Sequence, residues 1–448
     1  MNISFILPTR NNLKYLKLCV ESIRKHKGNH DVELCIWDDF SNDGTEDWLK
    51  SFEESDGLTL KWMRNGGPKR LGHTILYNKI VEELTSNDLC IIFHADMYLC
   101  PGALDAIEKL MHRKIEMYNY EEYEIRPGQK ARSIGNRVIR AIKRIVSLTR
   151  IEPPLHPSGR EKIVKDFGTE PENFDEESLM SALSIPMVKR LDDGPHDYSK
   201  YGYFVTEGKT TEGVFAPWAF WKDEFLEIGG HDYLFAPQSK EDSDIWNRFL
   251  LNGTKFIQTW EGFVYHFTSR GSRFNPTLTK VGTNSQEWED QNLRSTRNFI
   301  RKWGSMIEHD QFLLPIVPHK YNVGFVVTNC SFILLYNLEI WCDHIQCDLT
   351  PEIIDTYIEI EQPNTSYDLS LKINSKNTSK LPDIIVKIDG RNLNQNDFTV
   401  LTNLSKILTE SAEENSEMEV GNLIFNIGKL NHYEKDLIVV KNDTGDLK

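Results

Sequence analysis

The sequence predicts an α/β fold in which helices cover both faces of a parallel sheet. Over residues 1–110, short apolar runs alternate with segments whose apolar residues recur at helical spacing. Strands that are separated by helices pair in parallel, because each connection has to cross over to the next strand. The length of 448 residues exceeds one ordinary domain and predicts two or three.

The elements of this first part follow one another in a regular order. Strands are expected at residues 3–8, 32–37, 58–65 and 88–96. Helices are expected at residues 13–26, 45–54, 75–86 and 101–113. The first helix has apolar residues at Leu13, Leu16, Val20 and Ile23, and the last has Pro101 in its first turn.

Polar residues stand where three of these strands end. The groups that directly follow apolar runs are Pro8, Thr9, Arg10 and Asn11, then Asp38 and Asp39, then His94, Ala95 and Asp96. In open parallel sheets, ligands bind outside the carboxyl ends of the strands. We therefore expect the three groups to form one ligand site.

The rhythm is lost in residues 111–204, which we expect to be an insertion or flap near an acceptor site. Between Glu124 and Glu152 there are eight Lys or Arg residues and no acidic residue. Residues 136–150 could form a basic amphipathic helix. Such a helix would be either a solvated surface or a surface for anionic lipid or a charged substrate.

Helical and strand periodicity returns in the segment 205–310, which we expect to be the second half of the first domain. A helix over residues 239–253 ends at Gly253, and a strand over residues 255–266 follows it. From residue 320 the order strand, helix, strand repeats. Residues 320–448 are therefore expected to form a separate small α/β domain of unknown role.

Composition limits the function further. The 52 Lys and Arg against 67 Asp and Glu residues disfavour a nucleic-acid binder, which needs a basic face. If the ligand is a polyphosphate, a divalent metal is the simplest source of positive charge. The seven cysteines form no CxxC pair, which is typical of reduced thiols in the cytoplasm. Polar residues interrupt the apolar run 323–341, so membrane contact is expected to be at most peripheral.

Two sets of strand-end carboxylates could carry chemistry. Asp96 could bind Mg²⁺ or Mn²⁺, or it could cap the helix that follows. Asp38 and Asp39 could accept hydrogen bonds from a nucleotide base or ribose, or they could cap a loop.

A third set of acidic residues opens the helix near residue 240. Glu241, Asp242 and Asp244 oppose the helix dipole there, but three carboxylates are more than capping needs. A carboxylate beside others has a raised pKa, which suits a general base. His266 ends the next strand, where it either packs in the core or contacts a metal or a diphosphate.

Taken in order, these segments resemble the family 2 glycosyltransferases of the GT-A fold. ISFILPTRNNLKYLKLCVESI is similar to that family's first strand and helix, and LCIWDDFSNDGT to its VVDDGSTDGT segment. HADMYLCPGAL stands at the place of its DxD motif. GVFAPWAFWKDEFLEIGGHD and KEDSDIWNRFLLNG resemble the segment before its catalytic helix and the ED-containing helix itself. The resemblance covers residues 1–110 and 205–275.

The resemblance implies an inverting transfer of a sugar from a nucleoside-diphosphate sugar to an acceptor hydroxyl, in glycan or polysaccharide synthesis. By resemblance, Thr9 and Asp39 would contact the nucleotide base, and Asp38 would lie near the ribose. The other donor-side residues would be Pro8, Arg10, Asn11, Ala95 and Arg270.

The catalytic side follows from the same resemblance. Asp96 would hold Mn²⁺ or Mg²⁺ at the donor diphosphate, and His266 would add a metal or phosphate contact. Asp242, beside Glu241, would deprotonate the acceptor, which is a glycan or a lipid-linked molecule. The implied enzyme is cytoplasmic, and its oligomeric state stays open.

This chain departs from the family pattern at position 94, where an aspartate is usual and His94 stands instead. Histidine is a tolerable ligand for Mn²⁺ and a poor one for Mg²⁺. His94 would therefore join Asp96 at the metal or contact the sugar or diphosphate.

Two other classes stay open. A non-catalytic carbohydrate- or nucleotide-sugar-binding protein would explain His94 as decay of the site. A nucleotide-sugar nucleotidyltransferase would need a glycine-rich loop after the first strand, and PTRNNLKY has no glycine. The chain also lacks GxGxxG, GxxxxGK[ST] and GxSxG, which disfavours dinucleotide oxidoreductases, P-loop NTPases and nucleophile-elbow hydrolases.

Overall fold

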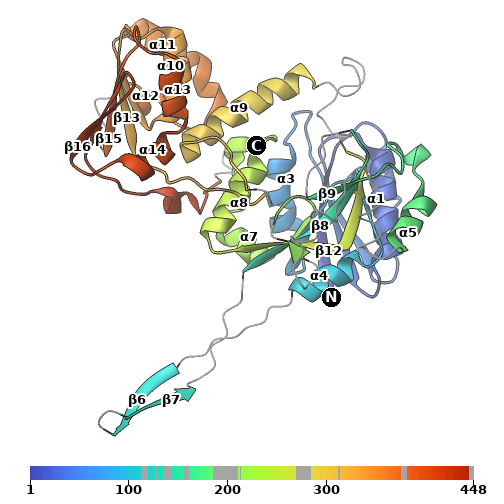
Figure 1. Ribbon diagram of the computed structural model, residues 1–448. Helices are drawn as coiled ribbons and strands as arrows, with labels where there is room; N and C mark the ends of the chain where they lie inside the picture. Colours follow the sequence, from blue (N-terminus) through green and yellow to red (C-terminus); the bar gives the residue numbers. More distant parts are fainter. Residues whose placement is uncertain are drawn as a thin grey trace.

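The described residues form two large sheets and a separate two-stranded sheet, and a long helix, α9 (Gln286–Trp303), connects the two large sheets (Figure 1). The computed structural model describes residues 1–111, 120–126, 129–134, 143–155, 161–184, 210–211, 213–268, 284–310, 313–374 and 381–442. Within these ranges, none of the helices combines the length and the apolar character that crossing a membrane requires.

The first sheet has ten strands, and its main path runs β10–β12–β8–β11–β4–β1–β2–β3. Its strands are β1 (Asn2–Thr9), β2 (Asp31–Asp38), β3 (Leu58–Arg64), β4 (Leu89–Ile92), β5 (Met97–Leu99), β8 (Arg144–Glu152), β9 (Lys162–Val164), β10 (Thr210–Thr211), β11 (Trp218–Trp221) and β12 (Lys255–His266). β1 pairs in parallel with β2 and β4, and β2 pairs in parallel with β3. This half of the sheet confirms the predicted parallel α/β fold.

Helices cover this sheet and account for its buried strands. They are α1 (Leu13–His26), α2 (Thr45–Lys50), α3 (His73–Lys79) with its π-helical continuation η1 (Ile80–Leu84), α4 (Ala103–Met111), α5 (Glu176–Ser184), α7 (Lys222–Glu227) and α8 (Glu241–Leu251). Successive residues of β1 such as Phe5 and Ile6 are fully buried although their side chains point to opposite faces. Both faces of this strand are therefore covered, as parallel sheets require.

The expected strand at residues 88–96 is shorter in the structure. β4 ends at Ile92, and β5 then pairs antiparallel with β12, where Leu99 lies opposite Val264. The intervening turn carries His94 and Asp96, so both residues sit between two strands rather than inside one. The turn brings them close to the end of β12.

The predicted basic helix over residues 136–150 is wrong for its described part. Residues 144–152 form β8, which lies between β12 and β11 in the sheet. Ile145, Val146 and Leu148 are fully buried, because β8 has neighbouring strands on both sides and covered faces. Part of the expected insertion 111–204 thus belongs to the sheet. β6 (Tyr120–Arg126) and β7 (Gln129–Ile134) form a hairpin that projects away from both sheets (Figure 1).

The second sheet has five strands in the order β14–β13–β15–β17–β16. These strands are β13 (Val323–Thr328), β14 (His344–Cys347), β15 (Ile384–Asp389), β16 (Ser416–Val420) and β17 (Leu423–Ile427). Its helices are α10 (Phe332–Leu338), α11 (Pro351–Glu361), α12 (Leu369–Lys372), α13 (Gln395–Thr402) and α14 (Leu404–Ser411). The sheet has a hydrophobic core of its own, centred on side chains such as Phe325 and Phe425.

A buried ion cluster fastens α9 to this second sheet's helices. Arg301 donates to Glu339 at 2.6 Å, and it also pairs with Glu361. Lys372 lies 2.7 Å from the other oxygen of Glu339, which is fully buried. Each charge in this cluster has an opposite partner, which is what makes their burial tolerable.

Glu339→Gln is expected to destabilise the protein by about 3–5 kcal/mol, because it leaves buried cations without their partner. Thermal or denaturant unfolding measures this loss. Glu359→Gln is the matched control, because Glu359 is an exposed residue of α11. Surface changes of this kind alter the free energy of unfolding by no more than about 0.5 kcal/mol. Equal stability of the two variants would contradict the assignment of a structural role to the cluster.

Candidate active site

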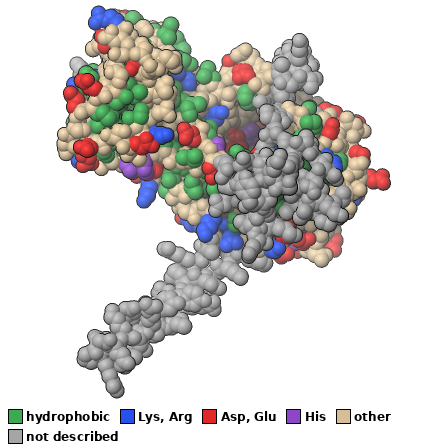
Figure 2. Space-filling view, viewed as in Figure 1, with side chains coloured by type: hydrophobic (Ala, Val, Ile, Leu, Met, Phe, Trp, Pro, Cys, Tyr) green, Lys and Arg blue, Asp and Glu red, His purple; other side chains and the backbone are tan. Residues whose placement is uncertain are grey.

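Three strand ends meet at one edge of the first sheet. Thr9 at the end of β1 lies opposite Asp38 at the end of β2. The β4–β5 turn and the end of β12 reach the same edge, and the backbone amide of Phe267 donates to the carbonyl of Asp96 at 3.0 Å. Figure 2 shows acidic and histidine side chains in a hollow near the middle of one face.

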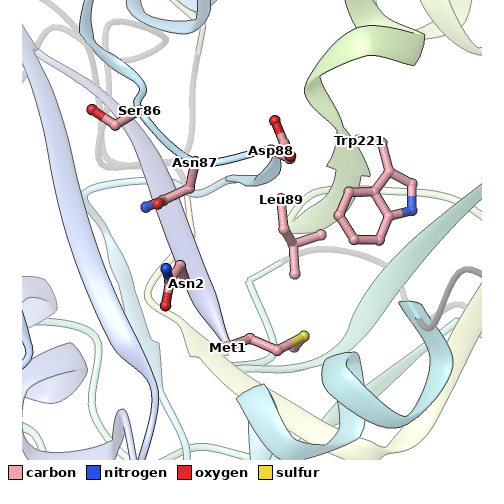
Figure 3. A pocket seen from close by; sticks show the side chains of 7 residues that line it. All are labelled: Met1, Asn2, Ser86, Asn87, Asp88, Leu89 and Trp221. Atoms are coloured by element: carbon pink, nitrogen blue, oxygen red, sulfur yellow. The ribbon is translucent and has the colours of Figure 1, made fainter.

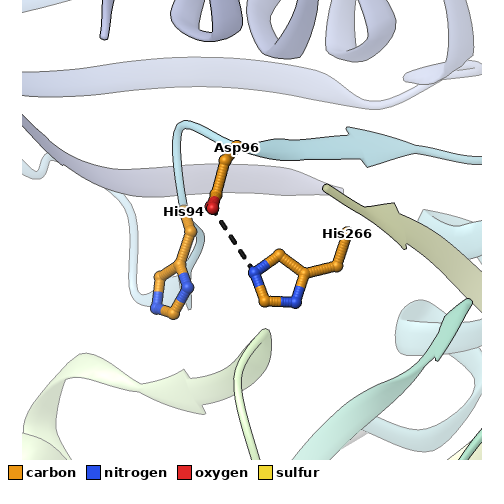
Figure 4. Close-up of side chains that lie close together, drawn as sticks. All are labelled: His94, Asp96 and His266. Carbon is orange, nitrogen blue, oxygen red and sulfur yellow. Dashed lines mark ion pairs between the residues drawn. The ribbon is translucent and has the colours of Figure 1, made fainter. Parts of the chain in front are cut away.

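His94, Asp96 and His266 form a cluster of the kind that binds a metal. One potential ligand atom from each lies within 4.8 Å of the others. His266 Nε2 is 3.6 Å from Asp96 Oδ1, and the two imidazole rings stand 6.1 Å apart between centroids (Figure 4). Two imidazoles and a carboxylate are a donor set that suits Mn²⁺ better than Mg²⁺.

The two histidines of this cluster have different protonation states. Burial lowers the pKa of His94 to about 4, so its ring is neutral and keeps a lone pair for a ligand bond. Burial would also lower the pKa of His266, but the charges and hydrogen bonds of Asp96 and Glu152 together outweigh it and raise the pKa to about 9. His266 therefore holds a proton that metal binding would displace.

Glu152 on β8 contacts His266 of the cluster, and Lys162 on β9 contacts Glu152 in turn. His266 Nδ1 is 2.8 Å from Glu152 Oε1, and Lys162 Nζ is 2.8 Å from Glu152 Oε2. Burial would raise the pKa of Glu152, but His266 and Arg150 outweigh it and hold that pKa well below its usual range. Glu152 is thus a buried carboxylate with cations on both of its oxygens. Sequence reasoning grouped Glu152 with Arg150 and Lys162 in the expected flap, but it gave Glu152 no role at a metal.

The three acidic residues at the start of α8, Glu241, Asp242 and Asp244, have different partners. Asp244 is fully buried, and it pairs with Arg248 at 2.8 Å and with Lys302 at 2.7 Å, so its role is structural. Glu241 Oε1 is 2.7 Å from His73 Nε2. Asp242 is half-buried and makes no hydrogen bond or ion pair with the residues that the structure describes. It is therefore the carboxylate of the three that is open to a substrate.

Asp242 has the electrostatics of a general base. Burial, and then the neighbouring Glu241 carboxylate, raise the pKa of Asp242 to about 7. For Glu241, burial would raise the pKa, but His73 outweighs it and lowers it. The two carboxylates therefore titrate differently. Glu241 is charged at neutral pH, whereas Asp242 can exchange a proton near neutral pH.

Glu241→Gln is expected to move the acid limb of the kcat–pH profile to lower pH. The limb reflects loss of activity as Asp242 takes up a proton below about pH 7. Removing the negative charge of Glu241 lowers the pKa of Asp242, so the base stays deprotonated in more acidic solution. Glu289→Gln, an exposed change of equal charge on α9, is the control. An unmoved limb would exclude Asp242 as the titrating base.

Asp242 lies near the cluster of His94, Asp96 and His266, which is called the metal-type cluster below. The Arg150 guanidinium acts electrostatically on both Asp242 and His94. The buried Tyr77 hydroxyl likewise experiences the charges of Asp242 and Asp96. Asp242 and the cluster of His94, Asp96 and His266 are therefore close enough to share the electrostatic influence of Arg150 and Tyr77. Sequence reasoning brought together Asp96, His266 and Asp242, but it missed His73 and gave Arg150 no specific role.

The Asp38 and Asp39 carboxylates hold loops in place. Asp38 is fully buried and accepts from Arg64 at 2.9 Å and from the Ser41 amide at 3.0 Å. Both of its carboxylate oxygens thus accept hydrogen bonds from the protein, and a contact with a ribose stays a prediction. Asp39 is also buried and accepts from the backbone amide of Gly72 at 2.9 Å.

Gly72 is required by this arrangement. Its φ is +80°, and an added Cβ would lie 2.2 Å from the Pro237 carbonyl oxygen. The loop that Asp39 fixes therefore packs directly on the segment leading to α8. Asp39 in this way helps to set the distance between the strand ends and Asp242.

The remaining donor-side residues surround these carboxylates. Thr9 Oγ1 donates to Asn12 at 2.6 Å, and Arg10 donates to the Asp39 carbonyl at 3.0 Å. Asn11 is exposed and adopts a positive φ of 50°. Pro8 is half-buried and Ala95 is buried. Arg270 lies outside the described residues.

A recess at the other end of the sheet does not coincide with this site. It is lined by Met1, Asn2, Ser86, Asn87, Asp88, Leu89 and Trp221 (Figure 3). Asn2 begins β1, whereas Thr9 ends it, so the recess lies at the amino ends of the strands. Ligands of parallel sheets bind at the opposite, carboxyl ends.

Comparison with known proteins supports the same class. Residues 4–158 match the family described as glycosyl transferase family 2. For this part of the chain, the match confirms the resemblance to that family. A curated relative, abequosyltransferase RfbV of Salmonella typhimurium strain LT2, is 31% identical over 123 residues. The match covers 26% of this chain and 35% of the length of that relative.

Solved structures show more distant similarity. S. aureus TarS is 12% identical with a TM-score of 0.36, covering 59% of this chain and 36% of its own. GalNAc-T7 with UDP, GalNAc and Mn²⁺ is 16% identical with a TM-score of 0.37, covering 67% and 48%. Mannosyltransferase PcManGT from Pyrobaculum calidifontis, with GDP-Man and Mn²⁺, is 14% identical with a TM-score of 0.37, covering 67% and 63%. Because these scores are low, the fold assignment rests on the strand order and the family match.

Proposed function

We propose that the protein is an inverting, metal-assisted glycosyltransferase that uses a nucleoside-diphosphate sugar. One observation supports this proposal: His94, Asp96 and His266 form a cluster suited to a metal, and the Arg150 guanidinium acts electrostatically both on this cluster and on Asp242, a carboxylate suited to act as a base. Arg150 acts on both groups, so a molecule between them would meet a metal, a guanidinium and a base. A sugar diphosphate and an attacking hydroxyl need these three partners.

His94, Asp96 and His266 would hold the metal, and their donor atoms favour Mn²⁺. A bound divalent ion would offset the charge that develops on the departing nucleoside diphosphate. Arg150 would add positive charge beside the same phosphate oxygens. The excess of acidic residues over the whole chain makes these local cations more important for binding an anionic donor.

Asp242 would act on the acceptor. Its carboxylate takes the proton of the acceptor hydroxyl while the oxygen attacks the anomeric carbon. The bond from that carbon to the diphosphate oxygen breaks, and its electron pair leaves with the diphosphate. Attack from the opposite face inverts the anomeric configuration. Glu241 keeps Asp242 basic by its charge, and His73 holds Glu241 in place.

The nucleotide would lie against the loop of residues 8–11 and the loop of residues 65–72. The Asp39 carboxylate holds the second of these loops, and the Asp38 carboxylate holds Arg64 just before it, so their role would be to shape the nucleotide site. The acceptor would be a glycan or a lipid-linked glycan. The domain formed by residues 320–448 would stabilise α9, whose Lys302 contacts Asp244 on the catalytic helix.

Donor binding tests this proposal directly. Calorimetry would titrate UDP-, GDP- and dTDP-sugars into purified protein with Mn²⁺, with Mg²⁺ and with EDTA. A CMP-sugar, which has one phosphate, is the control for the diphosphate requirement. We expect one nucleoside-diphosphate sugar to bind with Mn²⁺ and to lose affinity in EDTA. Absence of binding by every donor in all three conditions would contradict the proposal and favour a carbohydrate-binding protein.

A further inference from the structure

Glu152 occupies an unusual position behind the metal-type cluster. Its exposed fraction is 2%, yet it lies at the end of β8 beside the candidate site. Arg150 and Glu152 are two residues apart on this strand, so their side chains point to the same face. In the parallel pair of β8 and β12, Tyr265 lies opposite Ile151, which brings His266 beside Glu152.

The contacts of Glu152 fix the orientation of His266. Glu152 Oε1 is 2.8 Å from His266 Nδ1, so Nδ1 carries the hydrogen and Nε2 faces Asp96. The same oxygen lies 3.2 Å from Arg150 Nη1, and the other oxygen lies 2.8 Å from Lys162 Nζ. One carboxylate therefore sets the direction of both the imidazole and the guanidinium that face the site.

This geometry is more than a stabilising ion pair. A carboxylate that only neutralised Arg150 and Lys162 would not need to contact the ring nitrogen of His266. Metal-binding histidines characteristically donate their second N–H to a carboxylate, which selects the tautomer and orients the ring. Asp96 lies on the Nε2 side of the ring and Glu152 on the Nδ1 side, as that arrangement requires.

We propose that Glu152 is a positioning residue for the divalent metal: it orients His266 so that Nε2 binds the ion together with Asp96 and His94. The inference rests on the proposed metal-assisted function. It assigns a role in that function to a residue outside the ligand set. It also gives a function to the buried end of β8, which pairs with β12.

The test measures Mn²⁺ affinity without turnover. Free Mn²⁺ would be followed by electron paramagnetic resonance as it is titrated into wild-type protein and Glu152→Gln. Loss of a carboxylate behind a ligating histidine costs about 10- to 100-fold in metal affinity, and we expect a weakening in this range. Glu161→Gln is the matched control. A Glu161 oxygen lies 3.6 Å from the Arg150 guanidinium, and this substitution removes the same charge as Glu152→Gln.

Each outcome has a separate meaning. Weakened binding in Glu152→Gln with unchanged binding in Glu161→Gln supports the inference. Equal binding by wild type and Glu152→Gln overturns it, and so does an equal loss in both variants, because the effect would then be one of general charge. Absence of Mn²⁺ binding by the wild type overturns the metal site itself, and the inference with it.

A second variant allows the same measurement if Glu152→Gln alone does not fold. Glu152→Gln leaves Lys162 buried without its carboxylate, which could prevent folding. Glu152→Gln combined with Lys162→Met removes both charges together and keeps the buried charge balanced. We expect the double variant to show the same loss of Mn²⁺ affinity. Wild-type affinity in a folded double variant would overturn the inference.

Discussion

Asp242→Asn is expected to lower the transfer rate by about 10²- to 10⁴-fold while donor affinity stays unchanged. Asparagine has nearly the same shape as aspartate, but it cannot accept the acceptor proton. Burial and Glu241 raise the Asp242 pKa to about 7, so the group that is lost is the one suited to proton transfer at neutral pH.

Steady-state kinetics and donor calorimetry on the same preparation check this result. Asp244→Asn is an informative comparison, because Asp244 is fully buried and pairs with Arg248 and Lys302. That change should lower stability, whereas Asp242→Asn should not lower it, because the raised pKa of Asp242 shows that its charge is disfavoured in the folded protein. A collapse of donor affinity in Asp242→Asn would show that Asp242 binds the donor instead of acting only as the base.

Asp96→Asn is expected to abolish both metal-dependent donor binding and turnover. The amide keeps the shape of the side chain but removes the charge that faces His266 at 3.6 Å. It also removes an anionic ligand that a divalent ion needs beside two neutral imidazoles. The fold should persist, since His94 and His266 remain in place.

Mn²⁺ titration and nucleoside-diphosphate release check this second result. Asp105→Asn is the matched control, because Asp105 also lies in a cluster with a histidine, His30. His30 precedes β2 and so belongs to the opposite end of the sheet. Normal turnover in Asp96→Asn would defeat the assignment of the metal site.

Local sequence pattern predicted the first half of the fold well. Most strands and helices from residue 1 to 111 have strong periodicity and short connections, so they could be located without knowledge of their neighbours, whereas β5 was missed. The same reasoning located α8 and β12. Polar residues at strand ends could be grouped into one site, because all parallel strands end at the same edge.

The features that the sequence did not predict depend on residues that come close only in the folded structure. Residues 144–150 have a basic and apolar mixture that fits a helix, yet strands on both sides make this segment β8. Glu152 and His73 acquire roles only through partners that are distant in the chain, His266 and Glu241.

The strand-end carboxylates show the same limit. The pattern located Asp38 at a strand end, but only the structure shows that Arg64 occupies its carboxylate. A sequence motif therefore marked the site, while the packing around it decided which side chains are open to a ligand.

Release of nucleoside diphosphate by the purified protein tests the central claim most directly. Wild type, Asp96→Asn and Asp242→Asn would each be incubated with the donor that binds, in Mn²⁺ and in EDTA. If the proposed function is correct, water would slowly replace the missing acceptor and hydrolyse the donor. The account predicts release by wild type in Mn²⁺, with none in EDTA and little in either variant. Absence of release by wild type in Mn²⁺, or equal release by all three proteins, would contradict it.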